Sequence, residues 1–111
     1  MSQLAKAAEA LCASKYKRTA TPSQYIAGFN TRLGRQLALH RTQHAIYCWT
    51  QVIPLIGAPA SPIRQYAARD TRNSNLNAKN APSLCLGHAA HYWKFGDTTS
   101  FESFLDWYTH A

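Results

Sequence analysis

Histidine and cysteine side chains recur in two stretches of the chain, and they are the residue types best suited to bind zinc. His40, His44 and Cys48 lie four residues apart, so on a helix all three would project from one side. A Cys2His2 site would combine two residues from each stretch, for example His44 and Cys48 with Cys85 and His88. The sequence has no Cys-x-x-Cys pair, and no glutamate lies between His40 and His44 as in the metalloprotease helix motif. We therefore expect these side chains to line a seam between two packed helices, with a zinc site as the alternative.

The same side chains also allow a thiol nucleophile with a histidine base. On a helix His44 reaches Cys48, and His88 reaches Cys85. Covalent catalysis needs in addition a group that orients the base and a site for the oxyanion, and the sequence indicates neither. Acids are scarce, and the glycine-rich phosphate loops and the G-x-S-x-G motif are absent. We expect a protein that needs no cofactor and is not an enzyme, with a Cys/His-dependent enzyme as an alternative.

Positive charge is the strongest feature of the composition. The 111 residues include 12 Lys and Arg against 5 Asp and Glu, which gives a net charge of +7. Three of the acids lie between residue 97 and the C-terminus, where there is no Lys or Arg, so the rest of the chain has 12 basic and 2 acidic side chains. An excess of this size predicts an anionic macromolecule as partner, either a nucleic acid or an acidic protein surface.

The basic side chains cluster, and asparagines accompany them in the segment 70–81. Arginine forks match the geometry of phosphate groups, and asparagine amides bind phosphates or the edges of bases. The candidate residues for binding an anionic partner are Lys15, Lys17, Arg18, Arg32, Arg35, Arg64, Arg69, Arg72, Asn73 and Asn75.

Aromatic side chains make up 12% of the chain and provide the main alternative function. Trp and Tyr are favoured anchors of protein interfaces, and a chain of this size has difficulty burying many of them. The candidate anchors are Trp49, Trp93, Trp107 and Tyr108. They predict a protein–protein interaction module or a homodimer, in which the charge would serve only solubility.

These residues must be positioned by elements that the apolar spacing predicts to be helices. An Ala-rich stripe predicts a first helix over residues 2–15. Residues 21–24 (Thr-Pro-Ser-Gln) form a helix-capping sequence, and apolar residues at helical spacing then continue to residue 52, with a break near Gly34. Pro54 ends this helix. Further helix starts are predicted at Ser61-Pro62, Pro82-Ser83 and Thr99.

The evidence for strands is thin, because Val52 to Ile56 is the only cluster of β-branched residues and Pro54 interrupts it. We therefore predict an all-α fold, a compact bundle of five to six short-to-medium helices that forms a single helical domain over residues 1–111. Within it, residues 70–81 form an exposed Asn-rich loop and residues 97–111 an acidic, aromatic C-terminal helix.

The compartment and the function follow from the same features. No apolar run approaches the roughly 18 residues of a membrane span, and no secretory signal is evident, so we expect a cytoplasmic protein with free thiols. The function predicted is that of a small basic binding protein. It would act as a regulator or inhibitor by docking on nucleic acid or on a protein complex that handles nucleic acid.

Overall fold

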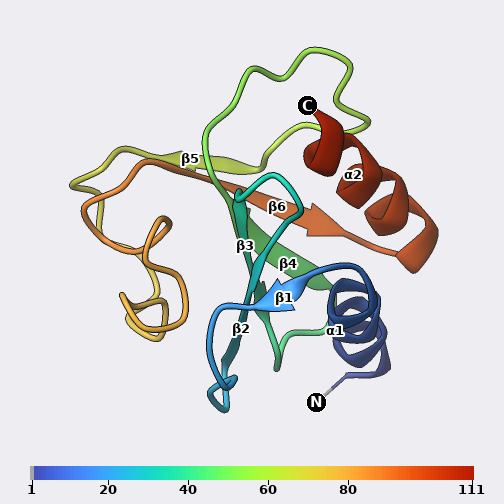
Figure 1. Ribbon diagram of the computed structural model, residues 1–111, viewed down its shortest axis with the longest axis horizontal. Coiled ribbons are helices and arrows are strands. Elements are labelled where there is room, and N and C mark those ends of the chain that lie inside the picture. The colour runs from blue at the N-terminus through green and yellow to red at the C-terminus, as the bar shows by residue number, and fades with distance from the viewer. Residues whose placement is uncertain (1) are drawn as a thin grey trace.

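The computed structural model describes residues 2–111, which form one six-stranded antiparallel sheet and two helices. The elements in chain order are α1 (Gln3–Lys15), β1 (Lys17–Arg18), β2 (Ile26–Asn30), β3 (Gln36–His40), β4 (Ile46–Thr50), β5 (Arg64–Tyr66), β6 (Ala90–Phe95) and α2 (Thr98–His110). The strands lie in the order β1-β2-β3-β4-β6-β5 (Figure 1). The fold is therefore α+β, and the prediction of an all-α bundle of five to six helices is wrong.

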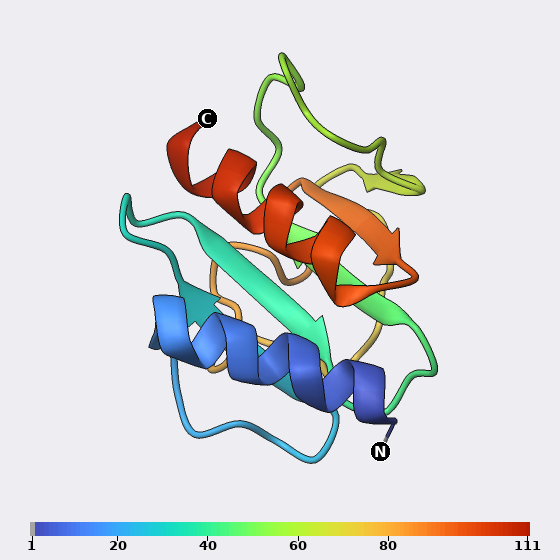
Figure 2. The ribbon, with the colours of Figure 1, turned by 90° about the vertical axis from the view of Figure 1, so that its right-hand side faces the viewer.

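The two helices begin at side chains that cap their first turns. The Ser2 hydroxyl accepts a hydrogen bond from the Ala5 amide, and the Asp97 carboxylate accepts one from the Ser100 amide. Both helices lie side by side on one face of the sheet, so that Cys12 and Phe104 belong to the same core (Figure 2). Neither helix found in residues 2–111 has the length and apolar character needed to cross a bilayer.

The long helix predicted over residues 21–52 is replaced by β2, β3 and β4. Gly34 has a positive φ of 80° in the turn between β2 and β3, a conformation that favours glycine. Ile26, Ala27 and Phe29 are all buried although neighbouring strand residues point to opposite faces. Both faces of the sheet are covered here, so the alternation of polar and apolar residues that identifies a strand is missing. The apolar residues then fall by chance at helical spacing.

The other two predicted helices are also strands. The Ser61-Pro62 start precedes β5, and the Pro82-Ser83 start lies in an irregular stretch before β6. Tyr66 of β5 and Ala90, Trp93 and Phe95 of β6 are buried in strands that pair with partners distant in sequence.

Residues 67–89, which we call the cover segment, form an irregular layer on the sheet face opposite the helices (Figure 1, yellow to orange). Leu76, Ala81 and Leu84 are buried there against the sheet, where they join Trp49 in a second core. The sequence predicted an exposed loop over residues 70–81. The structure has no helix or strand in that stretch, but it packs part of the stretch into this core.

Arg72 holds the cover segment together. Its guanidinium donates hydrogen bonds of 2.7–3.2 Å to four backbone carbonyls, those of Ala67, Asp70, Leu84 and His88. The guanidinium also lies 5.0 Å from the centre of the Tyr66 ring. One side chain therefore closes the two ends of the segment on each other.

Candidate nucleic-acid interface

The cover segment does not cover the whole of the sheet face on which it lies. Aromatic and basic side chains gather on the part that it leaves open. On β4, Cys48 points to the helices, so Tyr47 and Trp49 point to the opposite face. The antiparallel pairing with β6 sets Tyr47 opposite Lys94 and Trp49 opposite Tyr92. Trp49 is buried, whereas Tyr47 and Tyr92 are partly exposed and Lys94 is exposed.

His40 at the end of β3 and Arg64 at the start of β5 complete this group. His40 lies next to Tyr47 and Trp49, with ring centres 6.0 and 4.3 Å away. Arg64 is exposed and pairs with Tyr92 across β5 and β6. We call the surface the aromatic–basic patch; its residues are His40, Tyr47, Arg64, Tyr92 and Lys94.

The two partly exposed rings of the patch lie close to each other. The centres of the Tyr47 and Tyr92 rings are 5.7 Å apart and the ring planes differ by 18°. The Lys94 ammonium is 5.7 Å from the centre of the Tyr47 ring, within the range of a cation–π interaction. Tyr92 also packs on Trp49, with 4.9 Å between ring centres, so the buried tryptophan supports the partly exposed tyrosine.

Burial fixes the charge state of the inner part of the patch. It lowers the pKa of His40 to about 4, so the imidazole is neutral at pH 7. The Tyr92 hydroxyl lies 2.9 Å from the Nε2 atom of His40, and burial followed by the neighbouring Tyr66 raises the pKa of Tyr92. Both partners of this hydrogen bond are therefore neutral. The charges of the patch come from Lys94 and Arg64.

Neither of these two cations is neutralised within residues 2–111. The ion pairs found in this part of the chain involve Glu9, Glu102 and Asp106, and none of them includes Lys94 or Arg64. The Arg64 guanidinium lies 4.5 Å from the centre of the Tyr66 ring. The patch therefore presents two positive charges and two aromatic rings without a carboxylate.

The structure gives several of the predicted binding residues partners inside the protein. Arg18 pairs with Glu9, at 3.1 Å. Arg35 donates to the Tyr108 carbonyl, and Arg72 is committed to the cover segment. Asn73 accepts a hydrogen bond from the Asn75 amide within a turn of that segment.

The remaining predicted cations lie in three places. Arg64 belongs to the aromatic–basic patch, and Arg69 is exposed on the cover segment. Lys15, Lys17 and Arg32 line one groove between the end of α1 and the turn that follows β2. Sequence reasoning missed Tyr92 and Lys94 as binding residues, favoured a core role over base stacking for Tyr47, and weighed His40 only as a metal ligand. The alternation of aromatic residues in residues 46–50 and 90–95 was the available signal.

The predicted metal ligands do not come together. No group of three His, Cys, Asp or Glu side chains that could hold a metal ion occurs in residues 2–111. His40 and Cys48 point to opposite faces of the sheet, and His44 lies in the turn between β3 and β4. Burial also raises the pKa of the Cys48 thiol, which disfavours the thiolate that a metal or a substrate would need. Cys85 and His88 lie in the cover segment.

The predicted interface anchors are mostly core residues. Trp49, Trp93 and Tyr108 are buried. The Trp93 indole donates to the Thr50 hydroxyl at 2.8 Å, and the Tyr108 hydroxyl donates to the Gln36 carbonyl at 2.6 Å. Trp107 is partly exposed, and its indole donates to the Ile56 carbonyl at 2.9 Å. A role in the core accounts for the three buried side chains, and Trp107 packs against the core between the sheet and the helices.

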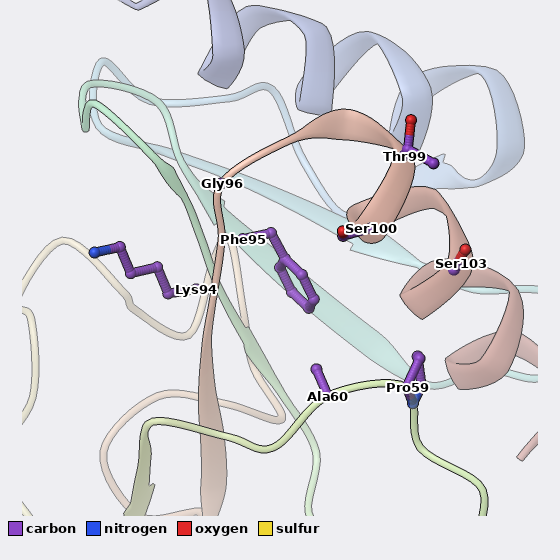
Figure 3. A pocket seen from close by; sticks show the side chains of 8 residues that line it. All are labelled: Pro59, Ala60, Lys94, Phe95, Gly96, Thr99, Ser100 and Ser103. Carbon is purple, nitrogen blue, oxygen red and sulfur yellow. The ribbon is translucent and has the colours of Figure 1, made fainter.

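A pocket of about 410 Å³ opens beside the first turn of α2, and its lining lacks a base that could activate its hydroxyl groups (Figure 3). Thr99, Ser100 and Ser103 bring hydroxyl groups, but its lining includes no His, Asp or Glu that could serve as their base. The Lys94 side chain points away from these hydroxyls (Figure 3) and toward Tyr47 on the other face of the sheet. The pocket thus lacks the charge that the patch has.

Comparison with known proteins adds no family to this description. No protein-family model, no curated protein and no solved structure matches the chain.

Proposed function

We propose that this protein binds single-stranded nucleic acid across the aromatic–basic patch. The observation that carries the proposal is the pair of partly exposed rings, Tyr47 and Tyr92, set beside the unpaired cations Lys94 and Arg64. Proteins that bind single strands combine aromatic side chains, on which bases stack, with cations that follow the phosphates. Four neighbouring residues provide both kinds of contact here.

The rings favour a single strand over a duplex. In a duplex each base has both faces covered by its neighbours, so its ring surface cannot reach a tyrosine. Unpaired bases expose that surface, and stacking of one base on an aromatic side chain contributes about 1–3 kcal/mol. A strand of any sequence can use this contact, since every base has an aromatic face.

The charge distribution supports the same ligand. The net charge of +7 attracts a polyanion over a distance of about one Debye length, and Lys94 and Arg64 place two cations at the rings. Tyr47 and Tyr92 line none of five cavities on the surface of residues 2–111, although Lys94 borders the cavity beside α2. Rings that lie outside these cavities suit an extended strand better than an enclosed small molecule.

The activity proposed is binding of the strand without catalysis. A small protein that covers an unpaired strand hides it from other proteins, and this is how a chain of this kind would act as a regulator or inhibitor of a nucleic-acid-handling complex. The Tyr92 hydroxyl lies beside the His40 imidazole, but burial raises the pKa of Tyr92 and lowers that of His40, which disfavours transfer of the proton from the hydroxyl to the imidazole.

Fluorescence anisotropy with short labelled strands of DNA and RNA, and with the matching duplex, tests the proposal. We expect the single strands to bind more tightly than the duplex. Tyr47→Ala should weaken binding by about tenfold, the worth of one stacked base, whereas Tyr47→Phe should keep most of the affinity. Lys94→Gln should weaken binding and reduce the slope of log affinity against log salt concentration by the contribution of about one phosphate contact. Lys79→Gln, at an exposed lysine of the cover segment, serves as its control. Equal binding of wild type and Tyr47→Ala would remove the patch from consideration.

A further inference from the structure

The groove between the end of α1 and the turn after β2 is a second cationic site, separate from the aromatic–basic patch. It has a volume of about 440 Å³, and its lining residues are Ser14, Lys15, Tyr16, Lys17, Asn30, Thr31 and Arg32. Three of the seven are cations and none is an acid. Lys17 and Arg32 take part in no ion pair within residues 2–111.

The third cation of the groove is only weakly neutralised. The Lys15 ammonium lies 3.9 Å from the Glu102 carboxylate, and the two side chains are 39% and 56% exposed. Exposed pairs of this kind contribute little, because water and salt screen them. Lys15 therefore remains able to contribute positive charge to the groove.

Thr31 provides an independent observation at the same place. The residue is 5% exposed, and its hydroxyl oxygen is buried with no hydrogen-bond partner among the residues that the structure describes. Its backbone is fixed, since the Thr31 amide donates to the Arg35 carbonyl and its carbonyl accepts from the Gly34 amide. The side chain, in contrast, changes the direction of its hydroxyl by rotation about one bond.

A buried hydroxyl without a partner destabilises the folded state, so native proteins usually satisfy such groups. Thr31 lines the same groove as the three cations, and its hydroxyl is without a partner there. An oxyanion in the groove would accept its hydrogen bond together with those of Lys17 and Arg32. Phosphate has the charge and the number of acceptor oxygens for such a set of donors.

We infer that this groove binds a phosphate group, with the Thr31 hydroxyl as a donor and Lys15, Lys17 and Arg32 as the cations. The phosphate would come either from the end of a nucleic-acid strand or from a small phosphate monoester. The site stands apart from the aromatic–basic patch. Lys17 pairs with Asn30 on β1 and β2, at one edge of the sheet, whereas Tyr47 and Lys94 lie on β4 and β6.

Amide chemical shifts of the labelled protein during titration with inorganic phosphate test this inference. We expect the largest shifts at Lys17, Thr31 and Arg32, and none of comparable size with chloride at the same ionic strength. Thr31→Val keeps the shape of the side chain and removes only the hydroxyl. It should weaken phosphate binding by about tenfold, the worth of one hydrogen bond to a charged group, while its thermal stability equals or exceeds that of the wild type.

The charge variants provide the matched comparison. Lys17→Gln and Arg32→Gln should weaken phosphate binding, and Lys79→Gln on the cover segment should not. A groove whose cations serve only the negative end of α1 would give a different result: Lys17→Gln would lower stability, and Thr31→Val would bind phosphate like the wild type. That result, or the absence of phosphate-specific shifts in the wild type, would overturn the inference.

Strands with and without a 5′-phosphate distinguish the two sources. If the 5′-phosphate raises the affinity of the strand, and this gain is lost in Thr31→Val but kept in Tyr47→Ala, the ligand of the groove is the end of a strand. Binding of inorganic phosphate without any such gain identifies a small monoester. Both results support the groove, and neither depends on the patch, because Tyr47→Ala leaves the groove unchanged.

Discussion

The hydrogen bond between Tyr92 and His40 determines how the exposed ring of the patch is held. The bond is 2.9 Å long. Both side chains are neutral at pH 7, because burial lowers the pKa of His40 to about 4 and raises that of Tyr92. The bond crosses from β6 to β3 and lies beside the buried Trp49. It fixes the direction of the ring, so a base that stacks on Tyr92 meets a preorganised surface.

Tyr92→Phe removes the hydroxyl and keeps the ring, so it separates their contributions to stability and to binding. The variant leaves His40 Nε2 without its partner, which should lower the free energy of unfolding by about 1 kcal/mol in urea denaturation. The ring remains, so affinity for a single strand should change by less than the tenfold expected for a lost stacking contact. A loss as large as that of Tyr92→Ala would mean that the hydroxyl, rather than the ring, contacts the ligand.

The lowered pKa of His40 makes stability depend on pH in one direction. The ordinary value of 6.5 applies to the unfolded chain, so between pH 6.5 and 4 the unfolded state binds a proton that the folded state does not. The free energy of unfolding should therefore be highest above pH 6.5 and fall as the pH is lowered toward 4, by roughly 3 kcal/mol from His40. Burial lowers the pKa of His91 as well, which adds to the same trend.

Titration of the imidazole resonances by NMR isolates the contribution of His40. We expect its midpoint near pH 4. A midpoint of His40 near 6.5 would show that the side chain is not buried as the structure has it.

At the scale of elements, the cover segment decides which part of the sheet stays open. It crosses β2 so closely that a Cβ atom on Gly28 would collide with the Asn80 carbonyl and the Thr19 hydroxyl. The Thr19 hydroxyl donates to that same carbonyl, and Gln36 accepts a hydrogen bond from the Ser83 amide. These contacts anchor the segment on β2 and β3, and its buried residues reach Trp49 on β4, whereas Tyr47 and Lys94 are not part of that core.

Two glycines test this contact as a matched pair. Gly28→Ala should lower the free energy of unfolding by about 1–3 kcal/mol, because backbone has to move to make room for the methyl group. Gly96→Ala places its methyl group where no atom lies within 4 Å and should leave stability nearly unchanged. Equal melting temperatures of the two variants would contradict the close packing of the cover segment on β2.

Two arginines of the cover segment form a second pair. Arg72→Lys keeps the charge but loses the planar guanidinium that reaches four carbonyls. It should therefore lower the free energy of unfolding by about 2 kcal/mol and speed amide exchange in residues 67–89. Arg69→Lys, an exposed neighbour, should change neither. Unchanged exchange in Arg72→Lys would show that apolar packing alone holds the segment.

At the scale of the whole molecule, local signals in the sequence located the terminal elements but not the sheet. The Ala-rich stripe of α1 and the aromatic stripe of α2 lie where helices were predicted. In residues 21–52 the same reasoning was wrong, because strands covered on both faces show consecutive apolar residues rather than alternation. Few β-branched residues occur in β2, β3 or β4 to correct it.

The site was hidden from the sequence for a related reason. Tyr47 and Lys94 are neighbours only because β4 pairs with β6, and the 39 residues between these two strands include β5 and the cover segment. Composition predicted a cationic binding protein, which remains a prediction, and it pointed to Arg64 within the patch. The aromatic partners of Arg64 needed the strand order to be recognised.

The most direct test of the central claim maps where a single strand touches the protein. Amide and side-chain chemical shifts should be followed while labelled protein is titrated with a short single strand that has no terminal phosphate. We predict that the changes concentrate at Tyr47, Arg64, Tyr92 and Lys94 and leave the exposed residues of α1 and α2 unaffected. Changes confined to the helix face, or no changes at concentrations that saturate the anisotropy signal, would show that the strand does not bind at the patch.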